Sequence, residues 1–318
     1  MSGITSIIKK ELSDHFSSYR FIILFALIAM VILITAYMAG MNIKQSLEGV
    51  AKPRFVFLML FTTSGALFSL SQFVAFFGPL IGLILGFDSI NRERNEGTLS
   101  KLLSQPIYRD AVVNGKFLAG VVMTTIMMIA IILVITGLGL STIGVVPGIE
   151  EIWRIFIYLL ISIIYISFWL GVAILFSIVF RSVATSALAA LAVWIFFSFF
   201  ISIGANVLAN SFAADANRGD QEAVLRQLKI ERAISLTSPM VLYTDSTATI
   251  IDPMRKTTRS FVQMGMLEQL SISRFSGPLP LSQSILVVLP YIISLLAITV
   301  ICFAFSYTIF MRQEIRSL

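Results

Sequence analysis

Six long runs without an ionisable side chain divide the chain. They cover Phe21–Ile43, Phe55–Phe87, Phe117–Ile149, Ile155–Phe180, Ser182–Ala214 and Phe275–Met311. A helix needs about 20 apolar residues to cross a bilayer, so each run is long enough for one span. Gly78 and Pro79 predict a kink or break in the second run. The pattern therefore predicts an all-α membrane protein with six transmembrane helices.

Residues 1–20 precede the first run and are amphipathic. Their apolar positions recur at helical spacing: Ile4, Ile7, Ile8 and Leu12. Charged residues occupy the other directions: Lys9, Lys10, Glu11 and Asp14. We expect a helix that lies on the membrane surface and leads into the first span; a frayed polar tail is the alternative. A cleavable signal peptide is disfavoured, because no small-residue cleavage site follows a short apolar core.

Basic residues near the spans predict the orientation, because Lys and Arg in short loops tend to stay in the cytoplasm. With the N-terminus inside, the inner segments carry eleven of them: Lys9, Lys10, Arg20, Arg92, Arg94, Lys101, Arg109, Lys116, Arg181, Arg312 and Arg316. The short outer loops carry four: Lys44, Lys52, Arg54 and Arg154. We expect a multi-pass protein of the cell membrane with both termini in the cytoplasm. The net charge of +6 then reflects topology and not nucleic-acid binding.

In this topology residues 209–280 form the longest outer segment, between spans 1–5 (residues 21–208) and the last span with its tail (residues 281–318). We expect Asp220 to cap a helix that ends near Ser235, and Ser238-Pro239 to break it. Thr244 to Thr249 is polar and turn-rich. Eight basic and seven acidic residues nearly cancel, which predicts a small folded extracytoplasmic domain.

Composition excludes most chemistry. The chain is 57% hydrophobic and 13% charged, against about 25% charged in soluble domains. Its single histidine, His15, and single cysteine, Cys302, predict no metal site and no catalytic residues. No phosphate-binding glycine loop is present, and no charge lies in the middle of a span, which argues against ion-coupled transport. The stretch Glu150–Arg154 is interpreted as an outer interfacial anchor.

One dense cluster of charge, Asn91–Lys116, separates the second and third runs. Leu99, Leu102 and Leu103 form an apolar stripe at helical spacing, and Pro106 ends that helix. Ser104 is expected to cap a second helix, which runs through Arg109 and Lys116 into the third span. A short helix of this kind suits docking into a groove of another protein. An ordinary solvated loop is the alternative.

The same segment resembles the E-x-G-T-L…L-L-S-x-P-I-x-R…G-K signature of ABC-2 type ABC transporter permeases, and most of all the Gld- and Nos-type branch linked to multicopper enzyme maturation. The matching residues are Glu93, Glu96, Gly97, Thr98, Leu99, Leu102, Leu103, Ser104, Pro106, Ile107, Arg109, Gly115 and Lys116. The resemblance implies the six-span fold of type V exporters. It makes residues 91–105 a coupling helix that docks on a separate ATPase, residues 1–20 a connecting helix, and the turn at Arg181 a second contact.

The resemblance also implies partners and a function. Two permease copies form a homodimer, and the ATPase subunit binds ATP and Mg, so this chain carries no cofactor and is not an enzyme. We expect export of an amphipathic, lipidic or other small substrate. The alternative is a mechanotransmitter that acts on an extracytoplasmic protein without moving a solute. A membrane-embedded enzyme is the weakest hypothesis, because no catalytic constellation can be assembled.

In such permeases the second and fifth spans commonly line the dimer interface. Here they carry polar side chains that we interpret as part of a substrate path through the membrane: Ser71, Gln72, Ser198, Ser202 and Asn206. Small polar residues are also common at helix-packing positions in membranes, which is the alternative for each of them.

Overall fold

The computed structural model describes residues 2–48, 53–63, 68–99, 108–213, 221–255 and 277–313. Within these ranges six helical stretches are long and apolar enough to cross a membrane, which confirms the predicted all-helical, six-span fold. The helices that form them are α2 (Tyr19–Ser46), α4 (Leu70–Gly86) with α5 (Asn91–Asn95), α7 (Arg109–Ile143), α8 (Ile149–Val179), α9 (Val183–Ile195) with η1 (Phe196–Phe200), and α14 (Leu281–Arg312).

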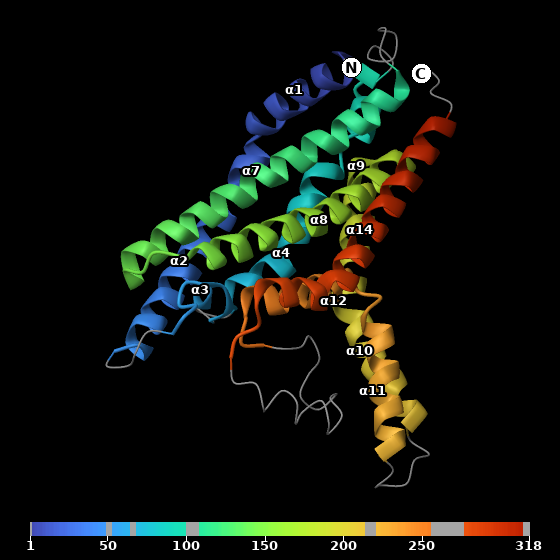
Figure 1. Ribbon diagram of the computed structural model, residues 1–318. Helices are drawn as coiled ribbons and strands as arrows, with labels where there is room; N and C mark the ends of the chain where they lie inside the picture. Colours follow the sequence, from blue (N-terminus) through green and yellow to red (C-terminus); the bar gives the residue numbers. More distant parts are fainter. Residues whose placement is uncertain are drawn as a thin grey trace.

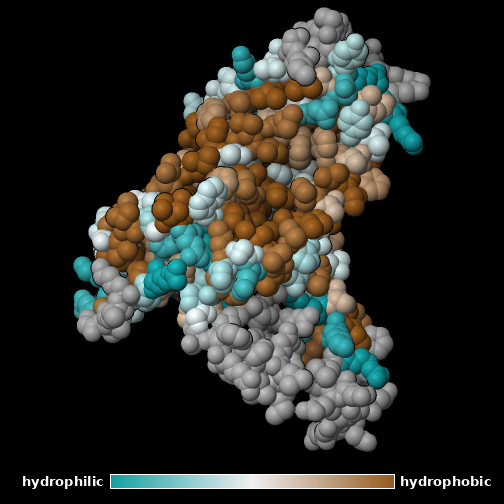
Figure 2. Space-filling view, in the orientation of Figure 1, coloured by the Kyte–Doolittle hydropathy of each residue, from teal (hydrophilic) through white to brown (hydrophobic). Residues whose placement is uncertain are grey.

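The bundle is built around α7 and α8, which pack side by side (Figure 1). α4 and α14 cover α8, while α2 and the amino-terminal helix α1 (Ser2–Phe16) pack on α7. A broad apolar band crosses the middle of the molecule, and hydrophilic residues gather toward its two ends (Figure 2). We call these the α1 end, where α1, the last turn of α14 and the α8–α9 turn lie, and the α12 end, where α12 (Pro239–Ile251) lies and α8 and α14 begin.

A row of glycines brings α4 and α8 into close contact. Gly78, Gly82 and Gly86 recur every four residues and so lie on one face of α4. A Cβ atom on Gly82 would lie 2.6 Å from the carbonyl oxygen of Ile166 and 2.8 Å from the backbone nitrogen of Leu170. Small residues at this spacing let membrane helices approach closely. The sequence analysis missed this motif, although its spacing is visible in the sequence.

α4 continues through Pro79, so the chain does not break there, and the kink stays a prediction. Pro79 has no N–H to donate to the carbonyl of Ala75, one helical turn earlier. The hydroxyl of Tyr165 on α8 donates to that carbonyl at 2.8 Å. A neighbouring helix thus satisfies the acceptor that the proline leaves free.

The segment predicted to lie outside the membrane, residues 209–280, contributes to the bundle itself. α10 (Ile201–Ala213) continues η1 and packs against α11 (Gln221–Ser235), the helix predicted to end near Ser235. α12 (Pro239–Ile251) packs against α8, α14 and α4. Residues Thr244–Thr249 lie inside α12, so the prediction of a turn-rich stretch there is wrong. Their hydroxyls bond to carbonyls in the preceding turn, as Ser246 does to Leu242 and Thr247 to Tyr243, and tertiary packing buries the helix.

Arg154 holds the α12 end together. Trp153 is 55% exposed, as an interfacial anchor should be, but Arg154 is fully buried, so this part of the anchor prediction is wrong. The guanidinium pairs with Glu150 at 2.9 Å. It also donates to three carbonyls and one hydroxyl, those of Thr249 (3.2 Å), Ile250 (3.2 Å), Leu279 (2.6 Å) and Ser284 (3.2 Å). One side chain with five donors thereby ties α12 and α14 to α8.

Candidate functional site

The start of α5 is fixed by the end of α8. The hydroxyl of Ser177 accepts hydrogen bonds from the backbone N–H groups of Ile90 (2.9 Å) and Asn91 (3.1 Å). A helix start leaves such groups unpaired within the helix. The buried side chain of Asn91 donates in turn to the carbonyl of Phe87 at 3.2 Å. The charged segment that follows α4 is therefore attached to α8 at its first residue.

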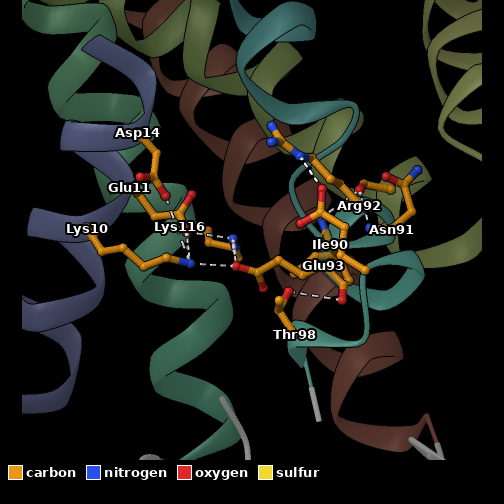
Figure 3. Close-up of polar contacts among 11 residues, drawn as sticks. Lys10, Glu11, Asp14, Ile90, Asn91, Arg92, Glu93, Thr98 and Lys116 are labelled. Carbon is orange, nitrogen blue, oxygen red and sulfur yellow. Dashed lines mark hydrogen bonds and ion pairs between the residues drawn. The ribbon is translucent and has the colours of Figure 1, made fainter. Parts of the chain in front are cut away.

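Four charged side chains from three helices meet beside α5 (Figure 3). The ammonium of Lys116 on α7 lies 2.7 Å from a carboxylate oxygen of Glu11 on α1 and 3.1 Å from one of Glu93 on α5. Lys10 reaches the same Glu93 oxygen at 3.0 Å. We call Lys10, Glu11, Glu93 and Lys116 the ion-pair cluster. It joins α1, α5 and α7, which are far apart in the sequence.

Burial makes the ion-pair cluster a strong constraint. The side chains of Lys116, Glu11 and Glu93 are 4%, 10% and 11% exposed. Removing one partner of such a buried pair costs about 3–5 kcal/mol, because the other charge is left uncompensated. Partial burial works against the charged form of Lys10, but its hydrogen bond to Glu93 and the carboxylates of Glu93, Glu11 and Asp14 raise its pKa above the ordinary value.

The sequence analysis named Glu93 and Lys116 but missed Lys10 and Glu11 as members of this site. Glu11 was placed on the polar face of the leader helix, yet only 7% of the residue is exposed. The sequence did contain a clue to the burial of Glu11, because Glu11 follows the apolar residue Ile7 by four positions. In the structure Ile7 is 3% exposed and contacts α7 at Gly115. Residues four apart share a helix face, so the buried face of α1 includes both.

The turn after α5 interrupts the helix predicted for residues 91–105. α5 ends at Asn95, and Gly97 has a φ of 69°, the left-handed conformation that favours glycine at a helix end. The hydroxyl of Thr98 donates to the carbonyl of Glu93 at 3.2 Å. Leu99 is 1% exposed and belongs to the core, so it does not present an outward apolar surface. Leu102, Leu103, Ser104 and Pro106 lie outside the described residues.

α7 begins later than predicted. Its first residue is Arg109, and Tyr108, with an extended backbone, occupies the N-cap. The prediction of Ser104 as the cap of this helix is therefore corrected. The carboxylate of Asp110 accepts the N–H of Ala111 at 2.9 Å, which supplies a partner for one of the free N–H groups of the first turn.

The short turn between α8 and α9 lies against α5. Arg181 in this turn has an exposed side chain, and its carbonyl accepts a hydrogen bond from the Asn95 amide at 3.2 Å. Glu96, by contrast, forms an exposed ion pair with Arg92 at 3.0 Å. The two segments predicted to contact an ATPase are thus bonded to each other within one chain.

Residues 5–315 match the family described as ABC-2 family transporter protein. The chain belongs to this family. None of the curated proteins compared with the chain matches it. Members of the ABC-2 family are the membrane components of transporters and work in general with an ABC ATPase; the Gld- and Nos-type branch stays a prediction.

In this ABC-2 protein a cleft of about 620 Å³ opens beside the ion-pair cluster. Its polar lining includes Lys10, Asp14, His15, Asp88 and Arg92, and its apolar lining includes Phe21, Ile84, Leu85 and Phe87. Across the parts of the chain that the structure describes, no three His, Cys, Asp or Glu side chains come together in a way that could hold a metal ion.

The polar residues predicted to line a substrate path lie at separate places. Ser71 and Gln72 are in the first turn of α4, where Gln72 forms a capping box with Ser69. Asn206 and Ser202 lie on α10. Ser198 lies in η1, a π-helical turn that the sequence analysis missed, and its buried hydroxyl has no partner among the described residues. π-helical turns occur frequently at functional sites, and the substrate path stays a prediction.

Proposed function

We propose that this ABC-2 protein is the permease subunit of an exporter that moves an amphipathic or lipidic substrate, driven by ATP hydrolysis in a separate ATPase subunit. The observation that carries the proposal is the bonding at the α1 end, where ion pairs and hydrogen bonds join α1, α5, α7 and the α8–α9 turn. Such a network can move as one body when a partner pushes on any part of it. ATP and Mg then belong to the partner, and this chain supplies the membrane path.

The proposed mechanism follows these bonds. The α1 end faces the cytoplasm, and the ATPase docks on residues 91–105 and on Arg181. ATP binding closes the ATPase and displaces α5. The Glu93–Lys116 pair carries the displacement to α7, and Ser177 carries it to α8. Two copies in the cell membrane, each with its own ATPase, would then alternate between inward- and outward-open states selected by the nucleotide.

Lipid export can be tested in proteoliposomes that contain the full-length chain and its partner ABC ATPase subunit. ATP added outside drives only those copies whose α1 end faces outward. A fluorescent phospholipid should therefore move from the outer to the inner leaflet and become protected from dithionite. An ATPase variant without its catalytic carboxylate is the control. Equal protection with both ATPases would reject lipid export.

Docking can be tested on the segment from the signature. The double change Leu102→Asp, Leu103→Asp should abolish ATPase binding and stimulated hydrolysis, because carboxylates cannot fill an apolar groove. Val146→Asp makes the same type of change at an exposed site before α8 and should leave both unchanged. Unchanged binding by the double variant would contradict docking through this segment.

Mechanotransmission is a second candidate, favoured by the α10–α11 pair. These two helices pack together and extend away from the bundle at the α12 end (Figure 1), where an extracytoplasmic protein could contact them. In that case the ATPase would be stimulated in the proteoliposomes while no labelled lipid moved. Lipid movement that tracks hydrolysis would instead favour export.

A further inference from the structure

Three arginines gather at the α1 end. Arg94 lies on α5, Arg109 begins α7, and Arg181 occupies the α8–α9 turn. None of them forms an ion pair with another residue that the structure describes. The carboxylates nearby have other partners: Glu93 pairs with Lys10 and Lys116, and Glu96 pairs with Arg92. Among the described residues no carboxylate pairs with these three side chains, and we call Arg94, Arg109 and Arg181 the arginine cluster.

Gln313, directly after α14, holds two of these arginines. Its side-chain oxygen accepts a hydrogen bond from Arg94 at 2.6 Å, and its backbone carbonyl accepts one from Arg109 at 3.3 Å. Its side-chain nitrogen donates to the carbonyl of Ile178, in the last turn of α8, at 3.0 Å. A neutral amide satisfies guanidinium donors without neutralising their charge. One residue thus positions α5, α7 and α8 relative to α14.

The third arginine is held close by its backbone. The Asn95 side chain bonds to the carbonyl of Arg181, which places Arg181 beside α5. Because Asn95 directly follows Arg94, this bond also places Arg181 near Arg94, which carries the same charge. The acidic residue next to Arg109 is Asp110, and its carboxylate accepts an N–H group of its own helix. Like charges held together in this way are stabilised when an acidic partner arrives.

We infer that the arginine cluster is a docking surface for carboxylate side chains of the ATPase subunit, and that Gln313 is the residue that positions it. This inference rests on the proposed function and names the partner chemistry. Arginine suits the role because its planar guanidinium binds a carboxylate through two parallel hydrogen bonds.

The first experiment measures the affinity of the full-length chain in nanodiscs for its partner ABC ATPase subunit, at low and high salt. Arg181→Glu should weaken binding by about tenfold or more, because it places like charges in contact. The side chain of Arg181 is exposed and forms no hydrogen bond or ion pair with another residue that the structure describes, so the change spares the fold. Arg226→Glu makes the same change on exposed α11 and should have no effect.

Two substitutions of Gln313 separate charge from structure. Gln313→Glu keeps the size and an acceptor oxygen, but it supplies a carboxylate that neutralises the cluster from within. It should weaken ATPase binding more than Gln313→Ala and flatten the dependence on salt, because fewer charges remain to be screened. If Gln313 had a purely structural role, Gln313→Ala would weaken ATPase binding more than Gln313→Glu, because alanine loses every side-chain hydrogen bond. That order would overturn the inference.

Failure of the inference differs from failure of the proposed function. If the wild-type chain binds and stimulates the ATPase while Arg181→Glu and Gln313→Glu bind equally well, the arginine cluster is not the dock and the permease function stands. If the wild-type chain neither binds nor stimulates the ATPase, both fail. Weaker binding by these two variants, with Arg226→Glu unchanged, supports the inference.

Discussion

Lys116 on α7 joins α1 and α5 to its own helix at the α1 end. Its ammonium contacts carboxylates of two other helices while only 4% of the side chain is exposed. Neither carboxylate can easily return to water. The buried ion pairs of Lys116 with Glu11 and Glu93 hold the proposed coupling segment, residues 91–105, to the bundle. The signature residues Glu93 and Lys116 therefore pair with each other within the chain.

Replacing Lys116 tests these ion pairs. Lys116→Met should lower the free energy of unfolding by about 3–5 kcal/mol, because two carboxylates then share Lys10. Adding Glu11→Gln restores the balance of charge and should recover a substantial part of the loss. Unfolding in detergent, followed by intrinsic fluorescence, measures both. Lys9→Met, a change at an exposed neighbour, is the control; an equal loss there would contradict the role of the buried pair.

His15 gives a direct view of the same region, because it is the only histidine in the chain. Burial lowers the pKa of its imidazole below the ordinary value of 6.5, and Lys116 adds to this, although the carboxylates of Glu11, Asp88 and Asp14 act against it. The unfolded chain then takes up the proton first, so this contribution to stability is lost as the pH falls below about 6.5. NMR titration of labelled histidine should give a midpoint below 6.5; a higher midpoint would contradict the buried environment.

At the scale of elements, close packing along α4 sets how α4 and α8 move together. The glycine row leaves no room for a side chain at Gly82, because backbone atoms of α8 occupy that space. Contacts between backbones have little freedom to adjust, since no flexible side chain lies between them. Any displacement that reaches α4 should therefore be passed to α8.

A single methyl group tests this contact. Gly82→Ala should separate α4 from α8 and destabilise the protein by about 1–3 kcal/mol, the usual cost of overpacking. Gly137→Ala is the matched control, because a Cβ atom there meets nothing within 4 Å, and it should be neutral or stabilising. Thermal unfolding in the same detergent compares the two. Equal stability of both variants would contradict the close approach.

At the scale of the whole molecule, α9 presents an apolar face that no described element covers. Leu188, Leu191 and Ile195 recur at helical spacing and are 68%, 37% and 42% exposed. In a membrane, such a face contacts lipid or a second copy. The expected homodimer places the second and fifth spans at the interface, and α4 and α9 do lie together here, with the rings of Phe76 and Trp194 5.3 Å apart.

Crosslinking tests the dimer. In a Cys302→Ala background, which removes the only cysteine, Leu188→Cys should form a crosslinked dimer with a short bifunctional maleimide. Leu27→Cys lies on α2 and is similarly exposed, at 58%, and it should crosslink much less. Gel analysis of membranes reads out both. Equal crosslinking at the two positions would contradict an interface on α9.

The sequence by itself determined the six spans, the leader helix and the helix that ends near Ser235. Long uncharged runs, amphipathic spacing and the Ser238-Pro239 pair can each be seen within a short stretch of sequence. Burial of apolar side chains then stabilises the helices that these features predict. The family, too, could be predicted from the signature between Glu93 and Lys116. Segments whose structure depends on their immediate neighbours in the chain were therefore the predictable ones.

Only the tertiary structure decided which polar residues turn inward. Glu11 and Arg154 looked like surface residues, and Thr244–Thr249 looked like a turn, yet all are packed inside the molecule. Their burial is stable because distant residues supply partners: Lys116 for Glu11, and the ends of α12 and α14 for Arg154. Likewise, Gln313 meets Arg94 across 219 positions of sequence. A charge is buried only where an opposite charge or a hydrogen-bonding group meets it, and that meeting is a property of the fold.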